Sequence, residues 1–268
     1  MSELRYEIVP GFFIQDNARL ELDPASIAPT PPSLGLLSGS WSEFTSKIEQ
    51  LNSASANNSG IFYKVLFLGR HGQGYHNVAA SKYGEQAWDD YWSLLNGDGE
   101  MIWGPDPFLT ALGEDQARNA NAAWKAEVSK GIPLPQKLYS SPMRRAMRTL
   151  VFTFDGILTA TSPKPVVIEN WREEYGEHTC DKRRTRSEIH AEFPDFEFEN
   201  GFSEHDVLWT PERETKAHVD ERARNFLNRL FAQDIDDTYI SVTAHGGIIN
   251  GLLRVIGRGN YNMLTGGK

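Results

Sequence analysis

Short apolar runs alternate along the chain with longer segments in which apolar residues recur at helical spacing. The short runs predict strands that are buried on both faces. They occupy residues 62–69, 136–140, 166–168 and 239–244. The predicted helices occupy residues 77–95, 110–131, 141–160, 210–233 and 247–256, with a short one after Thr185. This alternation predicts an α/β fold, a three-layer α/β/α arrangement around a mainly parallel central sheet.

The pattern changes near residue 60. The alternation is regular over residues 61–268, which predicts a single catalytic domain there. Residues 1–60 are interrupted by prolines, and residues 52–59 form a Ser/Asn/Ala stretch typical of a loop. Because Phe12, Phe13 and Trp41 are too apolar for a disordered tail, we predict that residues 1–60 are an extension packed on the main domain. A short helix is expected near residues 41–51.

Two of the predicted strands end in the same way. Residues 62–69 lead into Arg70-His71-Gly72, and residues 239–244 lead into His245-Gly246. In open α/β sheets, ligands bind at the carboxyl ends of the strands, beside helix N-termini that favour anions. Arg70 adds a permanent, planar charge that suits phosphate, and a neutral histidine is a good nucleophile near pH 7. This edge is therefore predicted to hold a phosphoryl group, with histidine as its acceptor.

Composition limits the classes of partner. The chain has 268 residues, of which 40% are hydrophobic, enough to bury a full core. Its net charge of −9 argues against nucleic acid, which requires a concentrated basic face. No apolar run approaches the roughly 18 residues of a membrane span, and the first residues carry no readable secretory signal. With Cys180 as its single cysteine, the chain is expected to be cytoplasmic.

Four motifs follow one another between residues 65 and 250. They are Arg70-His71-Gly72 with Asn77, Leu109-Thr110 with Gly113 and Gln116-Ala117, Ser140-Ser141-Pro142 with Arg145-Ala146 and Thr149, and Ala244-His245-Gly246-Gly247. Together they resemble the histidine phosphatase superfamily, also called the phosphoglycerate mutase-like family. The resemblance extends to fungal phosphomutase-like proteins, which share a segment similar to residues 178–183. It implies a phosphoglycerate mutase-like fold and a reaction without cofactor.

The resemblance also implies roles for individual residues. His71 would accept the phosphate, and Arg70, Arg145 and His245 would hold its three oxygens. Arg144 competes with Arg145 for the inward position, and the spacing to the following alanine and threonine favours Arg145. Three further positions would contact the substrate or its phosphate, namely Gln73, Asn77 and Gly246.

The general acid is less sharply defined. Family members carry a glutamate shortly before a glycine that follows the third strand, and both Glu173 and Glu174 precede Gly176. Relatives with the pattern Leu-Arg-Glu-x-x-Gly point to Glu173. A carboxyl group beside bound phosphate has its pKa raised by like-charge repulsion, as an acid catalyst requires. The two residues remain alternatives at this point.

The leading functional hypothesis is a phosphomonoesterase that acts on a small phosphorylated metabolite through a phosphohistidine intermediate. A phosphosugar mutase is the first alternative, although mutases of the family usually have glutamate where this chain has Gln73. A non-catalytic phosphate-binding module is the second. The expected partners are a small phosphorylated substrate or free phosphate, and assembly as a homodimer stays open.

Other features favour structural interpretations. His178, Cys180 and Asp181 fit no zinc spacing, so no metal is expected. Trp88, Tyr91, Trp92 and Trp103 are more typical of core packing than of a substrate lid.

The glycine-rich C-terminal segment carries one further expectation. A final edge strand is predicted to be either absent or replaced by pairing from residues 1–60. The edge of the sheet near the active site would then be more open than is usual in the family.

Overall fold

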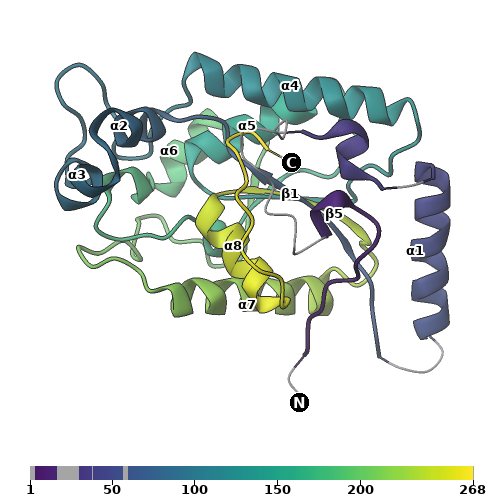
Figure 1. Ribbon diagram of the computed structural model, residues 1–268. Helices are drawn as coiled ribbons and strands as arrows, with labels where there is room; N and C mark the ends of the chain where they lie inside the picture. Colours follow the sequence, from purple (N-terminus) through teal and green to yellow (C-terminus); the bar gives the residue numbers. More distant parts are fainter. Residues whose placement is uncertain (1–3, 17–29, 38, 57–59, 268) are drawn as a thin grey trace.

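A parallel sheet forms the centre of the molecule. The structure, a computed structural model, describes residues 4–16, 30–37, 39–56 and 60–267 (Figure 1). The strands are β1 (Val65–Arg70), β2 (Lys137–Ser140), β3 (Val166–Val167), β4 (Glu197–Phe198) and β5 (Tyr239–Ala244). They lie in the order β1-β5-β2-β3-β4, and every pairing is parallel.

Helices cover both faces of this sheet. They are α1 (Trp41–Ala56), α2 (Tyr75–Tyr83), α3 (Glu85–Asp90), α4 (Ala111–Val128), α5 (Arg144–Phe154), α6 (Arg186–Glu192), α7 (Lys216–Gln233) and α8 (Gly246–Val255). Val65 and Phe67 pack with α1, α4 and α5, whereas Leu66 and Leu68 pack with α7 and α8. Alternate residues of one strand thus enter different layers, as a pleated strand dictates. The predicted three-layer α/β fold is confirmed.

Several element boundaries differ from the prediction. β4 was not predicted, because a strand of two residues is too short to show an alternation of apolar and polar positions. Helix α5 begins at Arg144 and not at Pro142, since the Ser141 hydroxyl turns toward the site. Helix α7 begins after Thr215 and not after Thr210. Residues 210–214 instead form backbone hydrogen bonds with residues 175–177, which excludes helix. Helix α1 continues through Ala56, beyond the predicted end at residue 51.

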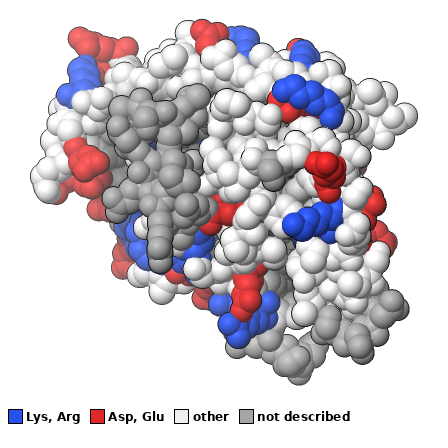
Figure 2. Space-filling model, turned by 45° about the vertical axis from the view of Figure 1, so that its right-hand side comes forward, with Lys and Arg blue, Asp and Glu red and all other residues white. Residues whose placement is uncertain are grey.

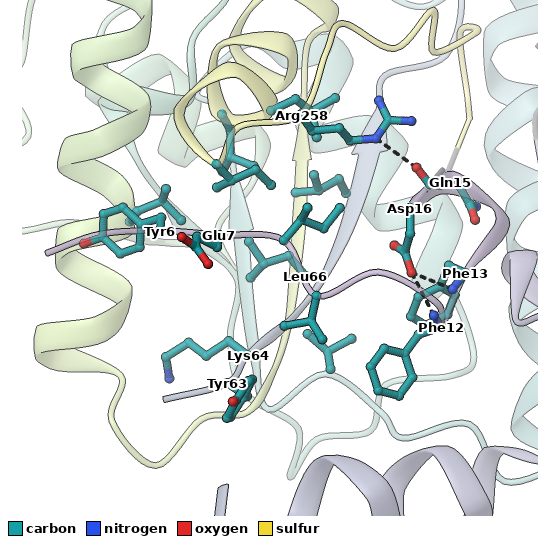
Figure 3. Close-up of a pocket in the computed structure, with 18 of the residues that line it drawn as sticks. Tyr6, Glu7, Phe12, Phe13, Gln15, Asp16, Tyr63, Lys64, Leu66 and Arg258 are labelled. Atoms are coloured by element: carbon teal, nitrogen blue, oxygen red, sulfur yellow. Dashed lines mark hydrogen bonds between the residues drawn. The ribbon is translucent and has the colours of Figure 1, made fainter. Parts of the chain in front are cut away.

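The described parts of residues 1–60 pack against the domain. Trp41, Phe44 and Ile48 of α1 are buried in the same cluster as α4 and α5, and Trp41 Nε1 donates to Glu127 on α4 at 2.8 Å. Residues 4–16 pass across β1. The Tyr6 hydroxyl of this segment donates to Asn228 Oδ1 on α7 at 2.6 Å. In Figure 3 the segment carrying Tyr6 and Glu7 crosses in front of the strand that carries Leu66.

Of the two alternatives for a final edge strand, its absence is the one seen, because no strand follows β5 within the described residues. The other alternative, pairing of residues 1–60 with the sheet, is wrong for the described residues. None of them forms a bridge with β1, and Phe13 pairs instead with Leu36. The end of β1 is bonded by the C-terminal segment, since Arg70 N donates to Gly267 O and Gly266 N donates to His71 O. Beside the rest of this edge lies an apolar cavity of about 700 Å³ between residues 4–16, β1 and α8 (Figure 3).

Candidate active site

The register of β1 and β5 brings two histidines together. Arg70 lies opposite Ala244, so His71 and His245 both follow directly at the carboxyl edge. His71 N donates to Ala244 O at 3.0 Å, and the two imidazole rings lie 5.0 Å apart. We call these two strand ends, with His71 and His245, the crest. Both side chains are almost fully buried, His71 with 2% of its surface exposed.

His71 has the form required of a nucleophile. Its Nδ1 lies 2.6 Å from Gly72 O, and a carbonyl can only accept, so Nδ1 carries the proton. Nε2 is then the atom with the free lone pair. Burial, followed by the charges of Arg145 and Arg70, lowers the pKa of His71 well below the usual value. The imidazole therefore stays neutral at physiological pH.

His245 is held by a residue that the sequence analysis did not assign to the site. Its Nε2 lies 2.7 Å from Ser141 Oγ, at the end of β2. Ser141 N also donates to Thr243 O, so β2 and β5 fix this contact. Burial and the charge of Arg145 lower the pKa of His245 well below the usual value. Ser141 was interpreted as a helix cap, and only strand order could have revealed its contact.

Arg145, and not Arg144, is the inward arginine of α5. Its side chain is 1% exposed, with Nη1 donating to Cys180 O at 2.9 Å and Nη2 to Asp181 Oδ1 at 2.8 Å. Arg144 instead stacks on Phe108 and pairs with Glu192. After burial, the charge of Arg145 is the next cause that lowers the pKa values of both crest histidines.

Arg70 lies on the other side of the crest. Its Nη1 donates to Met263 O at 2.7 Å, and a Cβ added to Gly246, the first residue of α8, would lie in van der Waals contact with its guanidinium. Arg70 Nε, Arg145 Nε and His245 Nδ1 are all buried without a hydrogen-bond partner. His76 Nδ1, whose ring lies 5.3 Å from that of His71, is unpaired as well. Buried polar atoms are rarely left unpaired, so this group of unpaired atoms indicates a ligand site.

The structure separates the two candidate acids. Glu173 turns toward the crest, where its carboxylate accepts from Gly247 N at 3.1 Å and from Glu174 N at 3.0 Å. A Cβ on Gly247 would overlap this carboxylate, so the approach requires glycine. Glu174 forms an ion pair with Lys216 on α7. Burial first, then the charges of Asp181 and Glu174, raise the pKa of Glu173 above its usual value.

The loop after His71 is supported by the start of α4. Thr110 caps this helix, and its hydroxyl donates to Gln73 Oε1 at 2.8 Å. Gln73 N donates to Gln116 Oε1 at 2.8 Å. A side chain on Gly72 or Gly113 would overlap the backbone of the other segment. The second sequence motif therefore buttresses the nucleophile loop, and the Gln73 side chain is used in that contact.

Asn77 also has a structural contact. Its Oδ1 accepts from Gly74 N at 2.9 Å and caps the first turn of α2. Next to it, His76 was not predicted as a site residue, yet its ring lies 5.3 Å from that of His71. Burial, then the charges of Arg145 and His71, lower the pKa of His76 well below the usual value. A third neutral imidazole thus borders the nucleophile.

Residues 169–215, which we call the acid segment, carry Glu173 and are held by buried ion pairs. Arg172 is bound through both terminal nitrogens to Asp206, each at 2.7 Å, and also donates to Asp181 O. Arg183 pairs with Glu169 at 2.9 Å. The charge-rich sequence gave no sign of this network, because its partners lie up to 34 residues apart.

The three residues considered above as potential metal ligands lie close together. The ligand atoms of His178, Cys180 and Asp181 lie within 4.8 Å of one another. However, both oxygens of Asp181 accept from arginines, Arg145 and Arg213. Burial, then the charge of Asp181, raise the pKa of the Cys180 thiol well above its usual value, which opposes thiolate ligation. The expectation of a metal-free reaction is kept as part of the proposal below.

The aromatic residues after α2 form a small core of their own. Trp88 and Trp103 are buried with Cys180, while Tyr83 stacks on Trp92 with ring centroids 3.9 Å apart. Thr179 Oγ1 donates to Leu95 O at 2.6 Å and joins this core to the acid segment. On the face in Figure 2, basic and acidic side chains are interspersed among the described residues. No helix in the described ranges is both long and apolar enough to cross a membrane.

Comparisons with known proteins agree with this geometry. The profile of the Histidine phosphatase superfamily (branch 1) matches residues 66–264. The chain is 40% identical to a "Probable phosphoglycerate mutase" of Arthroderma benhamiae, covering 98% of this chain and 82% of that protein. It is 40% identical to another "Probable phosphoglycerate mutase" from Saccharomyces cerevisiae, covering 78% of each.

Among solved structures, the alpha-ribazole phosphatase of Shigella flexneri is 19% identical with a TM-score of 0.46, covering 75% of this chain and 86% of that one. The mycobacterial glucosyl-3-phosphoglycerate phosphatase is 23% identical with a TM-score of 0.40, covering 70% and 78%. The profile match and the 40% identities decide the family. This chain belongs to the histidine phosphatase superfamily, branch 1.

Proposed function

We propose that the protein is a metal-independent phosphomonoesterase that acts on a small phosphorylated metabolite through a phosphohistidine on His71. One observation carries the proposal. Arg70, Arg145 and His245 each leave one buried polar atom without a partner, and all three residues surround a neutral imidazole. A tetrahedral phosphoryl group would satisfy these atoms through its non-bridging oxygens.

In the first step, His71 Nε2 attacks phosphorus as the bond to the ester oxygen breaks. The two arginines offset the charge on the phosphoryl oxygens, which is the main demand of this transition state. Glu173 gives its proton to the leaving alkoxide, so that an alcohol departs. The raised pKa of Glu173 supports this role, because the carboxyl group must be protonated beforehand.

In the second step, water attacks the phosphohistidine. Glu173, now a carboxylate, takes a proton from the water as the phosphorus–nitrogen bond breaks. Free phosphate forms, and His71 regains its neutral state with the proton on Nδ1. The hydrogen bond from Nδ1 to Gly72 O persists through both steps and keeps Nε2 directed at the phosphoryl group.

A phosphosugar mutase is the second candidate. The names of the two 40% identical fungal proteins favour it. A mutase must keep its product bound and return the phosphate to it, whereas a phosphatase admits water. Against it, Gln73 takes the place of the usual glutamate, and its side chain is bound to Thr110. A phosphate-binding module without turnover is disfavoured, because a nucleophile and an acid are both in place.

A cytoplasmic location belongs to the same proposal. Small phosphate esters are held inside cells, and a chain with Cys180 alone has no intrachain disulfide to lose in a reducing compartment. The proposal gives the protein a small phosphorylated substrate, with no nucleic-acid or membrane partner.

A phosphate-release screen tests the proposal. Sugar phosphates, nucleotides, phosphoglycerates and terpenoid or aryl phosphates are incubated with the purified protein, and both free phosphate and isomerised ester are measured. We expect free phosphate from at least one class, unchanged by EDTA. Interconversion of phosphoglycerates without release would establish the mutase. Binding of orthophosphate without either product would establish the binding module.

A further inference from the structure

Asp181 is a buried carboxylate that the proposed reaction leaves without a role. It lies in the segment His178-Thr179-Cys180-Asp181, and only 4% of its surface is exposed. Its Oδ1 accepts from Arg145 Nη2 at 2.8 Å, and its Oδ2 accepts from Arg213 Nη1 at 2.9 Å. One carboxylate thus joins the phosphate-site arginine to a second arginine that is one-quarter exposed.

The backbone around Asp181 fixes this position from several sides. Arg172 donates to its carbonyl at 2.7 Å, and Arg145 Nη1 donates to the neighbouring Cys180 carbonyl. Arg213 Nη1 also donates to Gly176 O at 3.0 Å, three residues beyond Glu173. The carboxylate is therefore held between the phosphate site and the turn that carries the acid.

We propose that Asp181 is a positioning residue that orients Arg145 for phosphate and, through Arg213 and its bond to Gly176 O, holds opposite charges in fixed places beside the turn that carries Glu173. The inference rests on the proposed function, since it assigns Asp181 to the first step of that reaction. Asp181 contacts neither phosphate nor leaving group. It acts through the two arginines and through its own negative charge.

The charges that face Glu173 come from every side. Within the acid segment these are Asp181, Glu174 and Arg213, and Arg70 approaches from β1. From α8 the Gly247 amide donates to the Glu173 carboxylate, and from α7 Arg222 donates to the Glu173 carbonyl at 3.1 Å. Asp181 is the largest charged contribution that raises the pKa of Glu173, after burial itself. Arg213 has the opposite sign and favours the carboxylate.

The Asp181 side chain is held in its ionised form. Burial alone would raise the pKa of Asp181, but Arg213 and Arg145 more than offset burial and hold it below its usual value. Asp181 is therefore ionised whenever the enzyme acts. Glu173 meets a fixed negative charge, and its proton is retained to higher pH.

Two substitutions with opposite expected signs test the inference. The pH dependence of kcat/KM is measured with a poor leaving group, because its basic limb reports the deprotonation of Glu173 in the free enzyme. Asp181→Asn removes a negative charge, so the limb should move to lower pH by about one unit. Arg213→Gln removes a positive charge, so the limb should move to higher pH.

Asp206→Asn is the matched control. Asp206 is an acidic residue of the same segment whose side chain is as buried as that of Asp181, but its carboxylate contacts Arg172 and not the phosphate site. It should lower stability and leave the limb in place. The inference would be overturned if the basic limb of the pH profile stayed in place in Asp181→Asn and Arg213→Gln. It would also be overturned if the limb moved in the same direction in both variants. If Asp181→Asn fails to fold, the direction of the Arg213→Gln shift decides alone.

A direct titration separates this inference from the proposed function. The carboxyl carbon of Glu173 is followed by NMR in the wild type and both variants, with Glu173→Gln to assign its signal. The pKa of Glu173 is expected to fall in Asp181→Asn and to rise in Arg213→Gln. If no ester is turned over but the titration shifts as expected, the proposed function fails and the assignment of Asp181 stands. If esters are turned over and the titration does not respond, only the assignment of Asp181 fails.

Discussion

The crest and the acid segment bring the proposed catalytic groups to the same place by different means. At the crest, His71 and His245 follow directly on paired parallel strands, and backbone hydrogen bonds set their separation. In the acid segment, Glu173 is positioned by arginines and carboxylates that are buried together. The crest depends on sheet register, whereas the acid segment depends on charge pairing. Perturbations should therefore separate the two regions.

The largest effect is expected at the crest. His71→Ala should reduce turnover by roughly a thousandfold or more, because the proposed reaction passes through phosphate on His71. The fold should remain, since the backbone pairing of β1 with β5 does not use the imidazole. Circular dichroism and a turnover assay measure the two outcomes.

Trapping of the labelled enzyme in detergent at alkaline pH sharpens this prediction. Label should be found on His71 and be absent from His71→Ala. His76→Ala is the control, because His76 has the neighbouring ring. Label that disappears in His76→Ala and persists in His71→Ala would move the nucleophile to the other histidine.

The next effect concerns the acid segment. Glu173→Gln should slow phosphorylation of the enzyme by about 100-fold for an alkyl phosphate and much less for nitrophenyl phosphate, whose leaving group needs no proton. Single-turnover kinetics with both substrates measure the difference. Glu174→Gln should spare both, because Glu174 pairs with Lys216. An equal loss for the two leaving groups would exclude Glu173 as the acid.

A third substitution breaks the acid segment without touching the crest. Arg172→Met leaves the Asp206 carboxylate buried without its arginine partner, whereas Glu169 keeps its ion pair with Arg183. Loss of one partner of a buried ion pair costs about 3 to 5 kcal/mol. Denaturant unfolding measures the change. The double variant Arg172→Met/Asp206→Leu should regain part of the stability. A loss below about 1 kcal/mol would show that the buried network is not what holds the segment.

The smallest expected effect tests the border of the acid segment. Thr185 caps α6 through Glu188 N, and the Glu188 carboxylate returns the contact to Thr185 N. Thr185→Ala should cost about 1 kcal/mol in the free energy of unfolding, with turnover unchanged. A loss of activity would show that α6 is coupled to the site more closely than its position suggests.

This contrast also explains what could be predicted from sequence. Runs such as residues 239–244 predicted a strand with its observed bounds, because a buried strand has a continuous apolar signature. Because the carboxyl ends of parallel strands meet at one edge, His71 and His245 were expected there before their contact was known, although the strand order itself was not predicted. The capping box at Thr185 likewise predicted α6 from local chemistry alone.

The acid segment resisted prediction for a physical reason. Its conformation depends on pairs such as Arg172 with Asp206, and sequence does not state which carboxylate an arginine selects. Thr210-Pro211 resembled a helix start, yet Gly176 requires close contact with the Glu212 carbonyl, which keeps this stretch extended. The same absence of a local signal concealed Asp181, Arg213 and the Ser141 contact with His245.

The strand order has a consequence for how the protein is made. β5 lies between β1 and β2, so β1 has no strand partner until residues 239–244 have been synthesised, whereas β2 can pair with β3 earlier. Contacts of such sequence separation form slowly, since the long intervening loop must close first. Nascent chains should therefore lack the centre of the sheet, and remain inactive, until residues 239–244 emerge from the ribosome. During that interval the apolar edge of β1 depends on chaperones for cover.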